Sequence, residues 1–389
     1  MSEGRYALVA GGGTAGHLQP ALAIAEALVD AGHGRDSIEF VGSRRGQDRV
    51  TLEGRGFPFT LLPGRGIARG RRAVDIWRNL GAVSGLLVAT VRAFALVVRA
   101  RPRVVVSVGG YASLPASSAA VLLGVPLVLV NVDAVPGAAN RLFGRFARAS
   151  AVGWPGSPLP RSVVTGTPVR PAIADVDRGP DARRQARRSL GLPADRPTVA
   201  VFGGSLGARR LNDAAAGLVE RWKDRTDRSI FHIVGRRDWD RCPPTGGDSG
   251  GGGTGKGPGL SVVSVPFEDR MDLVYRASDL VVCRAGAMTV AELAVAGVPS
   301  ILVPLPGAPG DHQTANARVL QRVGAALLLP DPECEAATLA ESIDRLLDDP
   351  PGLEAMGRAA RSMGRPDAAA AGAGLVEANA RPEPARRSA

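Results

Sequence analysis

A glycine-rich turn near the start of the chain ends in a histidine and could bind an anion. It reads Gly11-Gly12-Gly13-Thr14-Ala15-Gly16-His17, and it follows a short apolar run and precedes a helical pattern. Glycine lets a ligand approach the backbone closely, and the free N–H groups at the start of a helix bind anions. A nicotinamide enzyme would need an acidic residue after the next strand to hold the ribose. That strand runs instead into Gly42-Ser43-Arg44-Arg45, which disfavours a dehydrogenase.

Three further glycine turns follow apolar runs later in the chain. Each could be a plain connection between a strand and a helix, and each could also present backbone N–H groups to an anion. Because such turns recur at strand ends, we predict a site for a phosphorylated ligand. The turns read Gly109-Gly110-Tyr111-Ala112-Ser113-Leu114-Pro115, Gly203-Gly204-Ser205-Leu206-Gly207-Ala208-Arg209 and Cys283-Arg284-Ala285-Gly286-Ala287-Met288.

The last of these turns opens a helix with a threonine and a glutamate near its start. Thr289 is predicted near the helix cap, and Glu292 lies one turn inside. The structural interpretation is capping, with the carboxylate complementing the positive end of the helix dipole. The functional interpretation places a phosphate at the helix N-terminus and a ribose diol on Glu292. Arg170 could add a cation, and polar side chains of residues 311–316 could reach sugar hydroxyls.

A regular alternation of strands and helices must position these turns. Short β-branched runs alternate with longer alanine- and leucine-rich stretches, and the alternation restarts after residue 193. This pattern predicts an α/β fold with two Rossmann-like domains facing a central cleft, with ligands at the carboxyl ends of the strands. The predicted strands are Tyr6–Ala10, Ile38–Val41, Val104–Val108, Pro126–Val130, Thr198–Phe202, Ile230–Val234, Leu280–Cys283 and Ser300–Val303. The predicted helices are Pro20–Ala31, Ile76–Arg99, Ser113–Leu123, Ala182–Leu190, Leu211–Lys223, Thr289–Ala296 and Gln313–Val323.

The expected domain boundaries follow from this alternation and from composition. The N-terminal domain is predicted over residues 1–167, a linker with a first helix over 168–193, and the C-terminal domain over 194–350. A C-terminal helix over 351–378 could return to the N-terminal domain. The polar tail over 379–389 is predicted to be disordered, and the glycine-dominated stretch 243–259 to be a surface loop.

Composition and charge narrow the class of partner. The chain of 389 residues has 48 Lys and Arg against 37 Asp and Glu, a net charge of +11, which favours anionic partners. Aromatic residues make up only 4%, which disfavours the stacking of nucleic-acid bases, and we expect no nucleic-acid partner. Three scattered cysteines indicate neither a disulfide framework nor a metal site and favour a reducing cytoplasm. No secretory signal and no membrane-spanning segment is predicted.

Taken together, in this order and spacing, the four turns and the segment His312–Asn316 resemble the MurG-type members of glycosyltransferase family 28. The resemblance covers residues 5 to 365, and its specificity lies in the set of turns, because each turn alone is common. It implies the GT-B fold and an inverting, metal-independent transfer that uses no cofactor. The implied donor is UDP-N-acetylglucosamine, and the implied acceptor is the undecaprenyl-diphosphate-linked N-acetylmuramyl-pentapeptide of peptidoglycan synthesis.

The resemblance also assigns roles by position. Thr14, Ala15 and Gly16 match the family's first donor-site loop, and Glu268 falls where a backbone group reads uracil. The other matches to donor contacts are Arg170, Ser205, Ala287, Met288, Thr289, Val290, Ala291, Glu292 and Gln313. The loop that would face the lipid-linked diphosphate contains Gly109, Gly110, Tyr111 and Ser113.

One segment departs from the family pattern. The family usually has His-Glu-x-Asn where this chain reads Val130-Asn131-Val132-Asp133, so Asp133 takes the place of a substrate-binding amide, and the third turn has Leu206 instead of Gln. Two alternatives therefore stay open: a related GT-B enzyme with another acceptor, and a catalytically silent scaffold that binds a UDP-sugar.

His17 is the candidate catalytic base. It matches the histidine that closes the first loop, and histidine titrates near neutral pH, as the removal of a proton from the acceptor hydroxyl requires. The alternative role is structural, at the start of the helix.

A basic and partly apolar helix indicates an anionic membrane surface as a partner. Arg78, Arg92 and Arg99 lie near one face of the helix predicted over 76–99, with apolar side chains around them. Four more arginines, at 65, 69, 71 and 72, precede the helix. The structural alternative is a helix that packs on its sheet with solvated arginines. With a lipid-linked acceptor, we expect a peripheral protein on the cytoplasmic face of the cell membrane.

Overall fold

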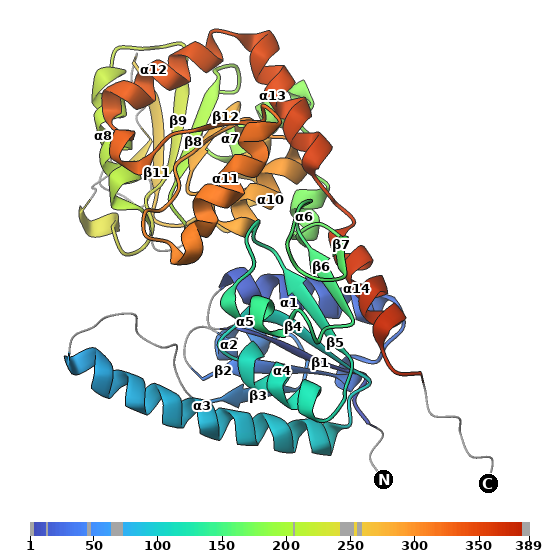
Figure 1. The fold of residues 1–389 in the computed structure, drawn as a ribbon. Helices are drawn as coiled ribbons and strands as arrows, with labels where there is room; N and C mark the ends of the chain where they lie inside the picture. Colours follow the sequence, from blue (N-terminus) through green and yellow to red (C-terminus); the bar gives the residue numbers. More distant parts are fainter. Residues whose placement is uncertain are drawn as a thin grey trace. The chain divides into compact units, whose positions relative to one another are not determined.

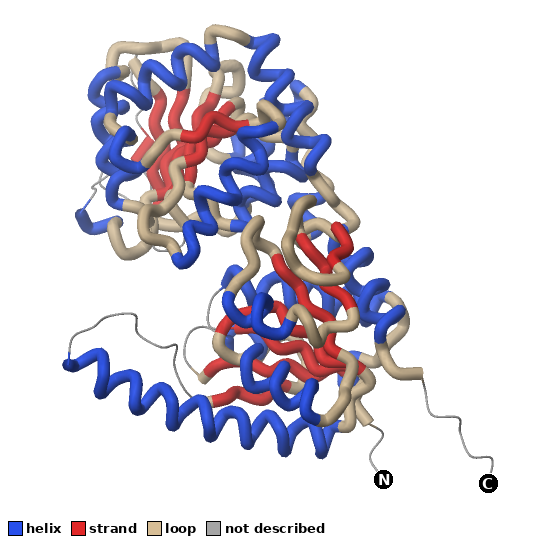
Figure 2. Tube along the Cα trace, in the orientation of Figure 1, coloured by secondary structure: helices blue, strands red, loops and turns tan. Residues whose placement is uncertain are grey.

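The chain folds into two compact units. The computed structural model describes residues 4–12, 15–44, 48–63, 73–204, 207–241, 253–254 and 259–382. Unit 1 contains the chain up to Val169 together with the segment from Asp367 onward, and unit 2 contains Arg170–Pro366 (Figure 1). Figure 2 shows that each unit is built around its own sheet, with helices along the sheet faces. Most of the predicted loop 243–259 lies outside these ranges, so the structure does not describe it.

Unit 1 contains a parallel sheet of seven strands in the order β3-β2-β1-β4-β5-β6-β7. Its central strands β1 and β5 are buried along their whole length and apolar except for Asn131 at the end of β5, as expected where helices cover both faces of a parallel sheet. The strands are β1 (Ala7–Gly12), β2 (Ile38–Ser43), β3 (Phe59–Leu62), β4 (Val104–Gly110), β5 (Leu127–Asn131), β6 (Ala149–Val152) and β7 (Ser162–Val164).

The helices of unit 1 include one from each end of the chain. α14, at the C-terminal end, packs along α1. α3 packs against α4 with one face, through Ala89, Ala93, Leu96 and Val97. The helices are α1 (Ala15–Asp30), α2 (Asp48–Leu52), α3 (Ala73–Ala100), α4 (Ser113–Leu122), α5 (Ala138–Phe143) and α14 (Ala368–Asn379).

Unit 2 repeats the arrangement. Its sheet has the order β10-β11-β9-β8-β12-β13-β14, and every pairing is parallel except that of β10 with β11. The strands are β8 (Thr198–Phe202), β9 (Ser229–Ile233), β10 (Gly253–Thr254), β11 (Ser261–Val265), β12 (Leu280–Cys283), β13 (Ser300–Leu302) and β14 (Ala326–Leu328). The helices are α6 (Pro171–Ala174), α7 (Pro180–Ser189), α8 (Arg209–Arg221), α9 (Met271–Ala277), α10 (Ala287–Ala296), α11 (His312–Arg322), α12 (Ala336–Leu347) and α13 (Pro350–Met363).

In both sheets the strand order reverses beside the first strand of the unit, and this reversal determines where a ligand can bind. In unit 1 the first strand, β1, lies between β2 and β4, and in unit 2 the equivalent β8 lies between β9 and β12. At such a switch point the loops after the two neighbouring strands diverge and leave a crevice beyond the carboxyl ends. The four glycine turns follow β1 and β4 in unit 1 and β8 and β12 in unit 2. Each pair of turns therefore flanks one switch point.

The C-terminal helix differs from the prediction. The single helix expected over 351–378 is two helices, α13 and α14, because the backbone is extended at Gly364 and Pro366 follows within two residues. α13 belongs to unit 2 and α14 to unit 1. The disordered tail predicted from residue 379 is wrong for residues 379–382, since Asn379 ends α14 and Arg381 N–H donates to Arg103 O (3.0 Å). Residues 383–389 lie outside the described part of the chain.

Candidate functional site

The His17 ring packs against the second glycine turn of unit 1. β1 and β4 pair so that Gly12 lies opposite Gly110 and Gly11 opposite Gly109. A β-carbon at Gly109 would stand 2.8 Å from His17 Cδ2, and one at Gly110 would collide with the carbonyl oxygen of Gly12. Both Gly109 (φ +107°) and Gly110 (φ +81°) also have backbone angles that other residues rarely adopt. Glycine is therefore required at both positions, and the turn supports one face of the imidazole.

The remaining predicted residues of unit 1 belong to the first glycine turn and to the second. Gly16 and Ala15 lie in the first turn of α1, whereas Thr14 lies outside the described residues. The Tyr111 hydroxyl donates to Pro63 O (3.2 Å), and burial raises its pKa. Ser113 is buried and its hydroxyl donates to Gly110 O (2.8 Å). This hydroxyl stabilises the turn, and the contact of Ser113 with the acceptor stays a prediction.

Two polar side chains near the carboxyl edge of this sheet hold the backbone in place. Asp48, which sequence reasoning missed, is buried and accepts a hydrogen bond from Ser43 N–H (2.8 Å). Its carboxylate fills the space where a side chain at Gly12 would stand, so it shapes the first turn. Asn131 is buried at the end of β5 and donates to Asp133 O (2.6 Å). Asp133 is half-buried just beyond that strand, at the same sheet edge as the two turns.

In unit 2 the N-terminus of α10 is available to an anion. The helix begins at Ala287 after Gly286, whose backbone is extended, and no side chain caps its first N–H groups. Thr289, predicted near the cap, is the third residue of the helix, in its first turn, and is half-buried. Val290 and Ala291 are buried in the core, so the predicted contacts of these two residues with a ligand are restricted to backbone atoms. Ala287 is buried as well, and Met288 is half-buried.

Glu292 is a buried carboxylate held by two partners. The Tyr275 hydroxyl donates to Glu292 Oε2 (2.8 Å), and Arg170 Nε lies 3.8 Å from Glu292 Oε1. Arg170 is fixed in turn, because its Nη1 donates to Asp269 O (3.0 Å). Burial raises the pKa of Glu292, and the Tyr275 hydrogen bond and Arg170 oppose this shift. A carboxylate in this setting can accept two hydrogen bonds from a vicinal diol.

Two buried side chains that the sequence analysis named only as parts of longer segments fix the loops around α10. Arg284 donates from Nη1 to Val303 O and to Pro304 O (both 3.1 Å), and it pairs with Asp331. Asn316 donates to Ala285 O (3.2 Å) and is fully buried, so it holds the turn instead of reaching a sugar hydroxyl as predicted. The sequence placed Arg284 inside the fourth turn and Asn316 inside the segment 311–316. The distant backbone groups to which these two side chains donate could not be predicted from it.

Glu268 and Gln313 make local contacts at the rim of this site. Burial acts to raise the pKa of Glu268, but the hydrogen bonds from Arg270 outweigh it and lower the pKa below its usual value. Glu268 Oε1 accepts from the Arg270 N–H (2.9 Å), so the backbone of Glu268 and not its side chain is left for a ligand. Gln313 Oε1 accepts from Leu305 N–H (3.0 Å). Ser205 lies outside the described residues.

A buried polar cluster supports the third glycine turn. His232 Nε2 lies 3.0 Å from Asn212 Oδ1, and Asn212 Nδ2 donates to Val234 O (3.0 Å). Asn212 Nδ2 also lies 3.3 Å from Asp238 Oδ2, and this carboxylate stands where a side chain at Gly207 would be. Burial lowers the pKa of His232 to about 4, so the ring is neutral at pH 7.

His232 should make unit 2 less stable in mild acid. Its pKa in the folded state is about 4, below the ordinary value of 6.5, so the unfolded chain binds the proton more tightly. The free energy of unfolding should therefore fall as the pH drops from 6.5 to 4, by about 3 kcal/mol from this group. His232→Gln keeps an amide donor toward Asn212 but does not titrate. Urea unfolding at several pH values should give a flatter curve for the variant, and a difference that is constant with pH would contradict the assignment.

The described ranges contain neither a cluster of metal-ligating side chains nor a membrane-spanning helix. No group of three or more His, Cys, Asp or Glu side chains in them could hold a metal ion. None of the helices they contain combines the length and the apolar character needed to cross a bilayer.

Comparison with known proteins gives matches along almost the whole chain. Residues 7–152 match the Glycosyltransferase family 28 N-terminal domain, and residues 198–371 match the Glycosyltransferase family 28 C-terminal domain. A relative from Desulforudis audaxviator is 38% identical over 366 residues, which cover 93% of this chain and 95% of that protein. A relative from Streptomyces coelicolor has the same identity and coverage. Both are named UDP-N-acetylglucosamine--N-acetylmuramyl-(pentapeptide) pyrophosphoryl-undecaprenol N-acetylglucosamine transferase.

Solved structures of other proteins have the same fold along almost the whole chain. The crystal structure of Acinetobacter baumannii MurG superimposes with a TM-score of 0.75 at 28% identity, over 97% of this chain and 100% of that one. The UDP-GlcNAc 2-epimerase from Neisseria meningitidis, bound to UDP-GlcNAc, has a TM-score of 0.60 at 11% identity, over 94% of this chain and 97% of that one. At that identity the second similarity concerns the fold alone.

Proposed function

This chain belongs to glycosyltransferase family 28, and from that premise we propose that it transfers N-acetylglucosamine from UDP-N-acetylglucosamine to undecaprenyl-diphosphate-linked N-acetylmuramyl-pentapeptide. The membership makes the protein a glycosyltransferase, and the predicted α/β GT-B fold is confirmed. The relatives that share 38% of its sequence carry both substrates in their names, and the alignment covers both units. The reaction is a step of peptidoglycan synthesis.

The observation that carries the donor half of this proposal is the arrangement at α10. An uncapped helix N-terminus can receive the diphosphate, while Glu292, held by Tyr275, can receive the ribose diol. Arg170 stands beside Glu292 and can stabilise the negative charge that develops on the departing UDP. The backbone near Glu268 would read the uracil, and Gln313 would contact the sugar.

For the acceptor half, we assign His17 as the base. In a single displacement with inversion, the acceptor hydroxyl oxygen attacks the anomeric carbon, its proton passes to His17, and the bond to UDP breaks. The Gly109–Gly110 turn supports the imidazole, and its backbone N–H groups would bind the diphosphate of the lipid. Asp133 replaces the family's amide at the same sheet edge, so an altered acceptor is the second candidate function.

A transfer assay tests the proposal directly. Labelled UDP-N-acetylglucosamine is incubated with the lipid-linked muramyl-pentapeptide, and we expect label in the lipid fraction in proportion to enzyme. Transfer to another lipid or glycoside, with none to the muramyl lipid, would support the altered acceptor. Tight binding of UDP-N-acetylglucosamine without transfer to any acceptor would favour the silent scaffold, which the proposal excludes.

We also propose that α3 rests on an anionic bilayer, which would place the protein at the cytoplasmic face of the membrane. Among its described side chains, one face is apolar and 40–70% exposed, and we call it the α3 face: Leu87, Val88, Val91, Phe94 and Val98. Leu96 and Val97, on the same helix, are buried. In Figure 1 α3 extends beyond the sheet at its N-terminal end.

Basic side chains beside the α3 face supply the attraction to anionic lipid. A surface cavity of about 850 Å³ between α3 and β3 is lined by four arginines, Arg44, Arg49, Arg92 and Arg99. Basic residues near a bilayer surface contribute about 1 kcal/mol each. Of the arginines predicted for this surface, residues 65, 69, 71 and 72 and the side chain of Arg78 lie outside the described part of the chain.

Val91→Asp should weaken binding to anionic vesicles by about tenfold, because it removes apolar contact and adds a like charge. The matched control is Val163→Asp, on the exposed strand β7 at the opposite edge of the same sheet, which should bind like the wild type. Binding is measured by co-sedimentation with vesicles of phosphatidylglycerol and phosphatidylcholine, and it should also weaken as salt is added. Equal losses in both variants, or indifference to lipid charge, would contradict the assignment.

A further inference from the structure

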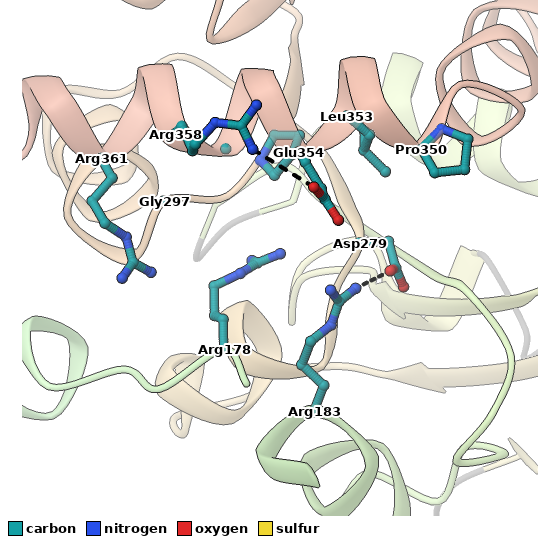
Figure 3. Close-up of a pocket in the computed structure, with 11 residues that line it drawn as sticks. Arg178, Arg183, Asp279, Gly297, Pro350, Leu353, Glu354, Arg358 and Arg361 are labelled. Atoms are coloured by element: carbon teal, nitrogen blue, oxygen red, sulfur yellow. Dashed lines mark hydrogen bonds and ion pairs between the residues drawn. The ribbon is translucent and has the colours of Figure 1, made fainter. Parts of the chain in front are cut away.

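Unit 2 contains a basic cavity that the proposed transfer does not use. It has a volume of about 410 Å³ and lies between α13 and the segment leading into α7 (Figure 3). Figure 3 shows Arg178 and Arg183 approaching from one side and the side chains of α13 from the other. Four arginines line it: Arg178, Arg183, Arg358 and Arg361.

The positive charges around this cavity exceed the negative ones. Its two carboxylates are Asp279 and Glu354. Asp279 pairs with Arg183 and is shared with a fifth arginine, since Arg187 Nη2 lies 2.7 Å from Asp279 Oδ2. Glu354 Oε2 lies 3.6 Å from Arg358 Nη1. Arg178 and Arg361 are left facing the cavity without a carboxylate of their own among the lining residues.

Two half-buried arginines of the cavity, Arg178 and Arg183, are crowded cations, and one of them has an unpaired donor. Arg178 donates through Nη1 to Tyr275 O and through Nη2 to Ser278 O, both at 2.9 Å. Burial, with the neighbouring cations Arg183, Arg361 and Arg187, lowers its pKa to about 9. The Nε of Arg183 is buried and has no hydrogen-bond partner in the structure. Crowded like charges cost free energy, and an anion in the cavity would relieve this cost.

We propose that this cavity binds a small phosphorylated anion of the diphosphate type. Guanidinium groups present forked N–H donors that match phosphate oxygens, and several converge here. The volume falls in the range of small-molecule sites, and Pro299, Pro350 and Leu353 provide an apolar wall for a further part of the ligand.

The cavity is separate from the proposed donor site. Arg361 Nη2 donates to Ala296 O (3.1 Å), and Gly297 lines the cavity, so its residues meet α10 at the C-terminal end. The donor diphosphate is assigned to the N-terminal end of the same ten-residue helix, about 15 Å away at 1.5 Å per residue.

Titration calorimetry with inorganic diphosphate, and separately with inorganic phosphate, tests the proposal on the full chain. Arg358 is 71% exposed, so Arg358→Glu should fold normally while weakening diphosphate binding at this site at least tenfold. Glu354→Gln should act in the opposite direction and tighten binding several-fold, because it removes a carboxylate from the cavity. The control Arg322→Glu changes an exposed arginine on α11 that does not line the cavity, and it should bind diphosphate like the wild type.

The outcomes separate this site from the donor site. UDP titrated in parallel should bind the wild type and the cavity variants equally, so a failure of UDP binding would count against the proposed function alone. The proposal is overturned if the wild type shows no diphosphate binding beyond that which UDP displaces. It is also overturned if Arg358→Glu and Glu354→Gln both leave the isotherm unchanged.

Discussion

Replacing His17 with alanine should lower the turnover number by about 10²–10⁴-fold, the range that general base catalysis contributes. The effect should fall on turnover and not on the KM for UDP-N-acetylglucosamine, because the donor contacts at Glu292 and α10 are untouched. The physical basis is preorganisation. The Gly109–Gly110 turn packs against the ring, so the base is already oriented when the acceptor arrives.

The pH dependence separates a base from a structural residue at this position. If His17 accepts the proton, kcat of the wild type falls on the acidic side as the imidazole becomes protonated, and His17→Ala should lose this acidic limb. The control is His33→Ala, which removes a histidine that stacks on Tyr6 and pairs with Glu377 elsewhere in unit 1. This control variant should keep the fall of kcat at acidic pH. Turnover within a few-fold of normal for His17→Ala, with the acidic limb intact, would contradict the role.

The sequence predicts the parts of this fold that depend on local pattern. β8 and β12 have the predicted bounds, and most other predicted strands and helices are displaced by one to five residues at an end. Their signal was strong because apolar β-branched runs end in glycine turns, where both the buried strand and the turn demand particular residues. β3, β6, β7, β10, β11 and β14 were not predicted. All except the five-residue β11 have four residues or fewer, and pairing with a neighbouring strand, not local propensity, makes these short segments strands.

The candidate site was predictable only where the chain itself brings groups together. The α10 turn was recognised because Gly286 and Glu292 are six residues apart. Tyr275 was not recognised, because an aromatic residue in an apolar helix is typical of a core position, and its partner Glu292 is 17 residues away. The support of His17 by Gly109 depends on a crossover that joins β1 to β4, which no local pattern specifies.

The glutamate of unit 2 should be the second most sensitive position. Glu292→Gln keeps the shape and the Tyr275 contact but removes the charge, so each diol hydrogen bond loses its charge-assisted part of about 1 kcal/mol. With two such bonds, kcat/KM for UDP-N-acetylglucosamine should fall by roughly thirtyfold, and Glu292→Ala should lower it further. Steady-state kinetics at varied donor concentration measures both values. An unchanged donor KM for Glu292→Ala would show that the carboxylate does not contact the donor.

Tyr275 should act through that glutamate, and its effect can be told from a packing defect by pH. Tyr275→Phe keeps the buried ring but removes the hydroxyl that donates to Glu292, a contact that lowers the carboxyl pKa against the effect of burial. The pKa of Glu292 should therefore rise further, and UDP binding should begin to weaken at a higher pH than in the wild type as the pH is lowered. At neutral pH the donor KM should rise by up to about tenfold with kcat nearly unchanged.

Tyr111→Phe, which removes a hydroxyl bonded to Pro63 in unit 1, is the matched control and should leave the donor KM unchanged. A Tyr275→Phe variant that binds UDP more weakly by the same factor at every pH would show that the hydroxyl stabilises the fold without positioning the carboxylate.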